Sequence, residues 1–387
     1  MRIAASLLLC LGLVACTHVP VAVRSPEPLF HDALFAAPTE PVTADDVFAL
    51  SDEMKRYVRD EIYRQVMTKG RQRALVDALY QRQRQQLLLE YDTAMTRNAA
   101  QAFAARSGNC LSLVIMTAAF AKELGLPLEY QSAFLEETWS RNGDLVLRSG
   151  HVNLTLGPRL VDMRGSVDTR SITIDFLPPE EALHLRTRAI DERTVVAMYM
   201  NNRAAEALVQ GRLDDAYAWA REAIRTSPDF MSAYNTLGVV YLRHRDLAEA
   251  EQALRRLLDQ EPGNTRAMYN LASVLDRAGR VAEAGALRQQ LTRIEPDPPF
   301  RFFSLGMAAM DRGDYRAARD WFAKEVARAD YYHEFHYWLG VASYKLGDIE
   351  AARTHLARAM EMSPSRRDSD LYAAKLAWLR SQQQQAH

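Results

Sequence analysis

Small residues recur every 34 positions in the second half of the chain, within segments whose apolar residues have helical spacing. One small position is taken by Ala204, Gly238, Ala272, Gly306 and Gly340, and another, twelve residues further on, by Ala216, Ala250, Ala284, Ala318 and Ala352. Prolines follow the same period at Pro228, Pro262, Pro296 and Pro364, with Asp330 in the gap. Small residues let paired helices approach closely and proline ends a helix, so this pattern predicts consecutive helix–turn–helix units.

A 34-residue helical hairpin resembles the tetratricopeptide repeat. The resemblance predicts five repeats over residues 193–366 and a capping helix and tail over 367–387, where "YAAKLAWLR" is found. It implies an all-α solenoid that binds a peptide or protein on its concave face. The residues expected on that face are Asn201, Asn235, Tyr269, Phe303 and Tyr337. The alternative for the aromatic residues among them is packing between repeats.

The first half has a mixed pattern, which predicts an α+β domain over residues 45–192. Residues 46–90 favour amphipathic helices, and residues 111–124 favour an apolar helix that ends near Gly125 and Pro127. Two strand patterns follow, "LEYQSAF" at 128–134 and "HVNLTL" at 151–156, before a Gly-Pro turn. Alternation along the second strand places Val152, Leu154 and Leu156 on one face and His151, Asn153 and Thr155 on the other.

Cys110 opens the apolar helix directly after the turn residues "RSGN". Backbone N–H groups and the helix dipole favour a thiolate there, and the same N–H groups can bind an oxyanion. His151 begins one strand, and Asp162 ends the strand expected after the turn at 157–158. Antiparallel pairing across that turn would bring His151 and Asp162 together.

This order of residues resembles the transglutaminase-like superfamily, which has a papain-like fold. The matching pieces are "GNC" at 108–110, "GHVNLTL" at 150–156 and "RLVDM" at 159–163. The resemblance implies that Cys110 is the nucleophile, His151 the base and Asp162 the residue that orients His151. No cofactor is expected. Candidate polar neighbours of the oxyanion are Asn109, Gln101 and Asn153. Leu111 and Val152 stand where family members often carry tryptophan, so the substrate pocket is expected to differ.

The first 44 residues predict an exported, anchored protein. "MRIAASLLLCLGLVAC" has Arg2 before an apolar run that is too short to span a bilayer, as in a secretory signal. Its last four residues resemble the bacterial lipobox, which implies a signal peptide over 1–15, lipid on Cys16 and, with Thr17 next, the outer membrane of a Gram-negative cell. The alternative is an ordinary cleaved signal with an incidental cysteine. Residues 16–44 hold five prolines and predict an extended tether.

Composition narrows the function classes further. The net charge of −1 over 387 residues gives no electrostatic argument for binding nucleic acid. Once Cys10 and Cys16 are accounted for by the signal and the lipid, Cys110 has no partner for an intramolecular disulfide. The histidines of "HEFH" at 333–336 lie on one helix face, but the spacing is one residue short of the zinc-protease motif and no third ligand is evident.

Two functions follow from these patterns. One is a cysteine-dependent acyl-transfer enzyme, acting as a peptidase, deamidase or transglutaminase, joined to a protein-binding solenoid. The other is a non-catalytic envelope scaffold in which the α+β domain is a degenerate enzyme fold.

Overall fold

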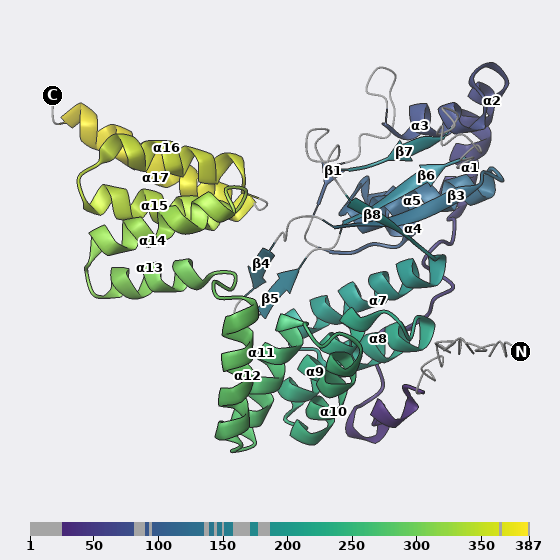
Figure 1. Cartoon of the computed structure of the whole chain (residues 1–387). Coiled ribbons are helices and arrows are strands. Elements are labelled where there is room, and N and C mark those ends of the chain that lie inside the picture. Colours follow the sequence, from purple (N-terminus) through teal and green to yellow (C-terminus); the bar gives the residue numbers. More distant parts are fainter. Residues whose placement is uncertain are drawn as a thin grey trace, which may run out of the picture.

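The computed structural model describes residues 25–80, 90–92, 95–134, 139–142, 145–148, 151–157, 171–176, 186–363 and 366–385. A mixed helix and sheet region precedes a long series of paired helices (Figure 1). Among the helices of these residues, none combines the length and the apolar character needed to cross a membrane.

The helices of the first region surround one long apolar helix, α5 (Cys110–Glu123). Twelve of the 14 residues of α5 are buried, which fits a helix that is apolar on every side. The surrounding helices are α1 (Asp52–Tyr57), a π-helical turn (Val58–Ile62), α2 (Tyr63–Lys69), α3 (Arg71–Tyr80) and α4 (Ala99–Ala105).

Four antiparallel strands form the main sheet, in the order β7-β6-β3-β8. These strands are β3 (Leu128–Phe134), β6 (His151–Leu156), β7 (Ile172–Ile174) and β8 (Arg186–Ile190). Helix α5 packs against β6 and β3. Two short pairs lie outside this sheet, the parallel pair β1 (Glu90–Tyr91) and β2 (Ser107–Gly108) and the antiparallel pair β4 (Trp139–Asn142) and β5 (Leu145–Arg148).

Five helical hairpins and a last helix make up the second half of the described chain, so the all-helical solenoid predicted there is confirmed. The hairpins are α7 (Glu192–Val209) with α8 (Leu213–Thr226), α9 (Met231–His244) with α10 (Leu247–Gln260), α11 (Thr265–Arg277) with α12 (Val281–Ile294), α13 (Arg301–Asp311) with α14 (Tyr315–Arg328), and α15 (His333–Lys345) with α16 (Ile349–Glu361). The last helix is α17 (Arg366–Gln385).

The predicted small positions lie where paired helices cross. A Cβ added at Gly238 would lie 2.6 Å from Leu254 Cγ, and one added at Gly340 would lie 3.1 Å from Leu356 Cγ. Leu254 and Leu356 occupy equivalent positions of their repeats, because the difference in number is 102, or three periods of 34. Close backbone approach therefore explains why this position holds only glycine or alanine.

The helical stack is interrupted between α12 and α13. The position equivalent to Leu254 and Leu356 is Arg288 in α12, which forms an ion pair with Asp276 instead of filling a core. Ala284 is the one buried residue of α12. The core that includes the first three hairpins ends at Ala284, and a separate core begins at Phe300. We call α7–α12 the first stack and α13–α17 the second stack; they are well separated in Figure 1.

Residues 27–40 of the predicted tether are bound to the first stack. Residues 27–40, here called the N-terminal strap, lie along α8 and reach α9 and α10. Phe35 stacks on Tyr217 with ring centroids 4.0 Å apart, and Tyr217 donates a hydrogen bond to Asp32. Arg225 of α8 binds Glu27. The prolines prevent this segment from forming its own core, but the helices provide aromatic and charged groups that hold it.

Two residues of the predicted concave face are not free surface positions. Phe303 is 1% exposed and packs against Phe300, Phe322 and Phe335. Tyr337 is partly covered by α17, where it stacks on Tyr372. The packing alternative holds for both side chains.

Candidate functional site

The site is built around the first turn of α5. Gly108 approaches Ser112 so closely that an added Cβ would lie 2.7 Å from Ser112 Cβ. Asn109 caps the helix, since its side chain accepts a hydrogen bond from Ser112 N at 2.9 Å. Cys110 is then the first helical residue and is 8% exposed. The "GNC" sequence is therefore explained by a close contact, a cap and a thiol at the helix N-terminus.

His151 lies beside Cys110 and is held by Asp175. The Nε2 atom of His151 lies 2.7 Å from Asp175 Oδ1, and Cys110 is near enough to raise the pKa of the imidazole. His151 is 3% exposed and begins β6, while Asp175 directly follows β7. Because Leu154 pairs with Ile174 in the sheet, Asp175 falls opposite Asn153, within reach of His151 on the same side of β6.

The charges around His151 favour a protonated imidazole. Burial alone would lower the pKa of His151, but its interactions with Asp175 and Cys110 raise this pKa to about 9. At neutral pH the imidazole is therefore positively charged and lies between a carboxylate and a sulfur atom. An imidazolium beside a cysteine stabilises the thiolate.

Of the predicted site residues, the structure places Cys110 beside His151, and the carboxylate that contacts His151 is Asp175. Asp162, the predicted orienting residue, lies outside the described residues. The sequence carried one signal for Asp175, the apolar strand pattern "ITI" followed at once by an acidic residue. Strand β7 was not predicted, because its pairing with β6 joins positions about 20 residues apart.

The three predicted oxyanion residues have other contacts. Asn109 Oδ1 accepts from Ser112, and its Nδ2 donates to Thr96 Oγ1 at 3.0 Å. Gln101 is exposed and forms a capping box with Asn98 at the start of α4. Asn153 Nδ2 donates to Asp175 Oδ2 at 3.0 Å, so Asn153 supports the carboxylate. These interactions leave the backbone N–H groups of the first turn of α5 as the best-placed donors for an oxyanion.

Asn153 also has an unused acceptor. Its Oδ1 is buried and has no hydrogen-bond partner within the described part of the chain. Gln131, Thr155 and Thr173 continue the polar row along this face through hydrogen bonds between their side chains. The face predicted to carry His151, Asn153 and Thr155 is thus polar and buried, which is unusual for a sheet that serves only as a core.

The histidines of residues 333–336 have separate partners. His333 Nδ1 lies 2.8 Å from the Tyr372 hydroxyl, whereas His336 contacts His355 and the Asp330 carbonyl. In the residues that the structure describes, no three His, Cys, Asp or Glu side chains converge as metal ligands would.

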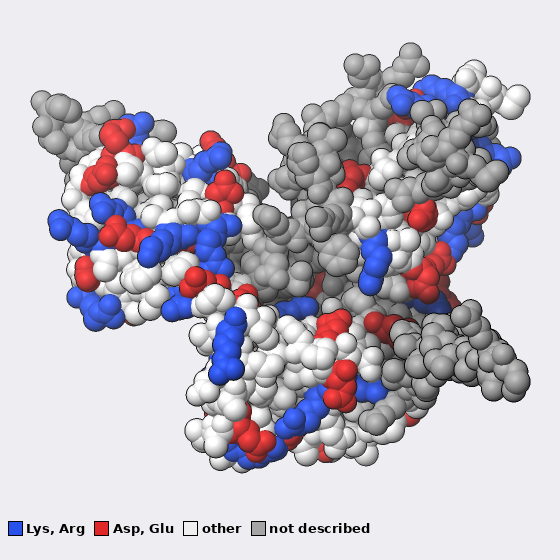
Figure 2. Space-filling model, viewed as in Figure 1, with Lys and Arg blue, Asp and Glu red and all other residues white. Residues whose placement is uncertain are grey.

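The remaining predicted positions of the concave face lie in the first stack. Asn201 Oδ1 accepts a hydrogen bond from Thr236 at 2.7 Å, and Asn235 Oδ1 accepts one from Asn270 at 2.9 Å. Tyr269 is 64% exposed. Figure 2 shows acidic and basic side chains interspersed on the visible face of both stacks, without a large area of one sign.

Comparisons with known proteins establish the class of the helical part. Tetratricopeptide-repeat profiles match residues 197–222, 235–298 and 303–370. The C-terminal region is therefore made of tetratricopeptide repeats.

Individual relatives share only parts of the chain. The TPR repeat-containing protein YvcD of Bacillus subtilis is 26% identical over 155 residues, which is 40% of this chain and 32% of YvcD. The protein O-mannosyl-transferase Tmtc3 of Drosophila melanogaster is 35% identical over 83 residues, 21% of this chain and 9% of its own length. The aligned part thus spans about a third or less of each of these relatives.

Solved structures give similar partial matches. YrrB, described as a TPR protein with an unusual peptide-binding site, is 23% identical with a TM-score of 0.25, over 46% of this chain and 92% of YrrB. PilF of Pseudomonas aeruginosa is 18% identical with a TM-score of 0.32, over 50% of this chain and 88% of PilF.

Proposed function

We propose that the protein is a cysteine-dependent acyl-transfer enzyme of the transglutaminase-like kind, joined to a protein-binding solenoid. The observation that carries the proposal is the arrangement at the N-terminus of a buried helix, where Cys110 lies beside His151 and Asp175 binds that imidazole. A cysteine that served only for packing would not need a charged imidazole beside it, nor a carboxylate and an amide beyond that imidazole.

The geometry supports a two-step reaction. The Cys110 thiolate attacks the carbonyl carbon of an amide, and first-turn N–H groups of α5 stabilise the oxyanion. His151 gives its proton to the nitrogen that leaves, so an amine or ammonia departs and a thioester remains on Cys110. His151 then takes a proton from water or from an amine as that molecule attacks the thioester, which releases an acid or a new amide. Asp175 holds the imidazole in position throughout.

Site-resolved alkylation of the full-length protein tests this proposal. Cys110 should react with iodoacetamide with a pH midpoint below the roughly 8.5 of a free cysteine. His151→Ala should raise that midpoint, and Asp175→Asn should raise it less, because the imidazole stays in place without its carboxylate. Asp162→Asn is the matched comparison and should have a smaller effect than Asp175→Asn.

The outcome also decides between enzyme and scaffold. If Cys110 reacts only after unfolding and His151→Ala leaves its reactivity unchanged, the chain is a scaffold with a degenerate enzyme domain. If the thiol is reactive, dimethylated casein with a fluorescent primary amine distinguishes the two acyl acceptors. Incorporation of the amine indicates transamidation, and release of ammonia without incorporation indicates hydrolysis.

The solenoid is proposed to bind the protein or peptide that reaches the thiol. The tetratricopeptide class and the exposed Tyr269 support this role. Tyr269→Ala should weaken capture of that partner without changing alkylation of Cys110. If Tyr269→Ala abolished both partner capture and Cys110 alkylation, Tyr269 would have a structural role instead.

We also propose that lipid on Cys16 anchors the protein to the bacterial envelope, on the outer membrane. The motif "LVAC" supports this proposal, although residues 1–24 lie outside the described residues. Cys16→Ser should move the protein from the membrane fraction to the soluble fraction. Retention in the membrane after a high-salt wash would rule out the lipid anchor.

A further inference from the structure

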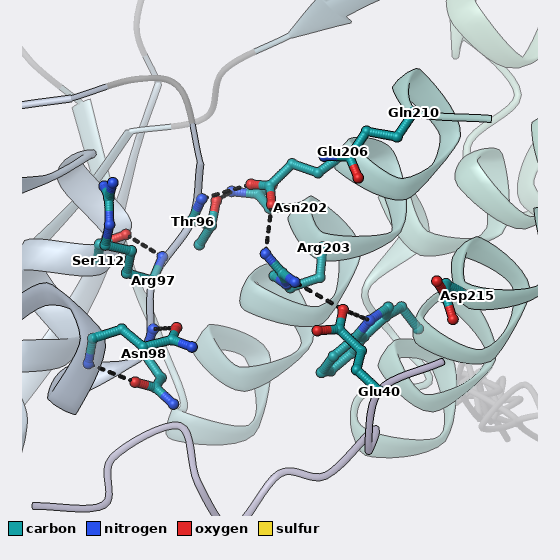
Figure 3. A network of polar contacts seen from close by, with 12 residues as sticks. Glu40, Thr96, Arg97, Asn98, Ser112, Asn202, Arg203, Glu206, Gln210 and Asp215 are labelled. Carbon is teal, nitrogen blue, oxygen red and sulfur yellow. Dashed lines mark hydrogen bonds and ion pairs between the residues drawn. The ribbon is translucent and has the colours of Figure 1, made fainter. Parts of the chain in front are cut away.

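A polar network joins the solenoid to the start of the cysteine helix. Glu206 of α7 accepts a hydrogen bond from Thr96 N at 2.6 Å, and Thr96 precedes α4 in the first region. Thr96 Oγ1 in turn accepts from Asn109 Nδ2 at 3.0 Å, and Asn109 is the cap residue next to Cys110. Figure 3 shows Thr96, on the segment before α4, facing Asn202 and Glu206 of α7.

The hydroxyl of Thr96 accepts two hydrogen bonds in this network. Its Oγ1 accepts from Asn109 Nδ2 at 3.0 Å and from Asn202 Nδ2 of α7 at 3.2 Å. Both lone pairs of the hydroxyl are therefore in use. Thr96 is 1% exposed, which means that water cannot replace a lost partner easily.

The next residue continues the link. Arg97 N donates to Ser112 Oγ at 2.8 Å, and Ser112 Oγ donates to Asn109 Oδ1. Asn109 is therefore fixed at both ends of its amide, with its oxygen on the helix and its nitrogen on Thr96. The orientation of the cap, and with it the position of Cys110, depends on Thr96.

The solenoid side of the network is also braced. Arg203 binds Glu206 at 2.9 Å and Glu40 at 2.8 Å, and Trp219 donates to Glu40 at 3.1 Å. Glu40 is the last residue of the N-terminal strap. Figure 3 shows Glu206, Arg203 and Glu40 linked one to the next. Glu206 is thus held in place by the solenoid and the N-terminal strap, and its position does not depend on Thr96.

We propose that Glu206 is a positioning residue for the Cys110 thiol, so that the first repeat of the solenoid is part of the catalytic unit. Glu206 acts through Thr96 and Asn109, by way of the Thr96 backbone N–H and hydroxyl. A change at α7, such as partner binding to the solenoid, can therefore reach the thiol through these two residues. This inference rests on the proposed function of Cys110.

The test compares two variants of Glu206 in the full-length protein. Glu206→Ala removes both acceptor oxygens and should raise the pH midpoint of Cys110 alkylation by on the order of one unit, a tenfold loss of thiolate. Glu206→Gln keeps an oxygen that can accept from Thr96 N, so it should restore part of the shift. Glu283→Ala is the control. Glu283 lies on α12 and forms an ion pair with Arg280, as Glu206 does with Arg203. Helix α12 is far from α5 in sequence and in Figure 1.

Three results separate the possibilities. If Glu206→Ala gives the same midpoint as Glu283→Ala, the positioning role is overturned and the proposed enzyme stands. If wild-type Cys110 already reacts like a free cysteine and ignores His151→Ala, the proposed function itself fails. Should Glu206→Ala not fold, Thr96→Val removes the acceptor of Asn109 at nearly constant shape. It should raise the midpoint in the same way, and an unchanged midpoint overturns the positioning role.

Discussion

Substitution of Gly306 by alanine tests the packing that defines the second stack. An added Cβ would lie 2.6 Å from Cδ1 and 2.8 Å from Cζ of Phe322. The Phe322 ring is fully buried, with Phe303 on one side at 5.7 Å and Trp338 on another at 6.3 Å between ring centroids. Because these aromatic neighbours hold the ring, α13 and α14 must move apart to admit the methyl group.

Two opposing terms set the size of the effect. Alanine is favoured over glycine inside a helix by about 0.5–1 kcal/mol. Overpacking of a filled core costs about 1–3 kcal/mol. We expect Gly306→Ala to lower the free energy of unfolding by about 1 kcal/mol. Gly340→Ala, in the same stack, meets its nearest atom at 3.1 Å and should be close to neutral.

Gly285→Ala should change the free energy of unfolding in the opposite direction. Gly285 lies inside α12 with no heavy atom within 4 Å of an added Cβ, so only the helix preference remains. This variant should be more stable by about 0.5–1 kcal/mol.

Urea unfolding of the full-length protein measures the Gly306 and Gly340 variants through tryptophan fluorescence, since Trp321 and Trp338 pack against the core around Phe322. Far-UV circular dichroism follows Gly285→Ala. If Gly306→Ala proves as stable as Gly340→Ala, the two helices do not cross at Gly306 and the 34-residue register is wrong in this repeat.

Two further predictions concern the strap and the buried histidines. Phe35→Ala should free residues 27–40 from α8, because the ring that stacks on Tyr217 is lost, at a cost of about 2 kcal/mol. Limited proteolysis measures this: cleavage within residues 27–40 should become faster, and an unchanged cleavage rate would contradict the prediction. His336 Nε2 must donate to the Asp330 carbonyl, so its Nδ1 accepts from His355, and burial lowers the pKa of both rings. A histidine with a lowered pKa in the folded state costs stability once the unfolded chain binds protons, so stability should fall as the pH drops below about 6.5. Urea midpoints at pH 5 and 7.5 measure this, and a double His336→Gln, His355→Gln variant with the same pH dependence would refute it.

The sequence predicted the helical hairpins well because each repeat supplies its own signal. Small residues, turn glycines and prolines return at one period, and errors in one repeat are corrected by the next. Phe303 shows where this fails. Its position is equivalent to Asn235 and Tyr269, yet it is buried, because the stack is interrupted before α13 and the aromatic core of Phe300, Phe322 and Phe335 is built there instead.

The sequence supplied local signals for only some residues of the candidate site. Cys110 and His151 lie at element starts, which turn residues and alternation reveal. Asp175 could not be chosen over Asp162 from local pattern, since the choice depends on which strand pairs with β6. The strap was missed for a similar reason. Its stability comes from Tyr217, Arg225 and other groups that lie nearly 200 residues away.

The boundary between the two predicted domains falls inside one physical unit. Residues 192 and 193 belong to the first turn of α7, and Asp191 caps that helix immediately after β8. Tyr130 of β3 donates to Glu192, and one continuous core runs from Val47 through α5 and α7 to Ala284. A cut at 192 would expose the apolar face of α7 and remove Glu206 from Thr96. The break that packing supports lies between α12 and α13, where Arg288 and the exposed side of α12 separate two cores. The amino-acid composition of the chain changes where the sheet ends, and this change suggested a domain boundary there. Which parts unfold together depends instead on which residues share a buried core. The α/β region together with the first stack is therefore the unit on which the chemistry of Cys110 depends.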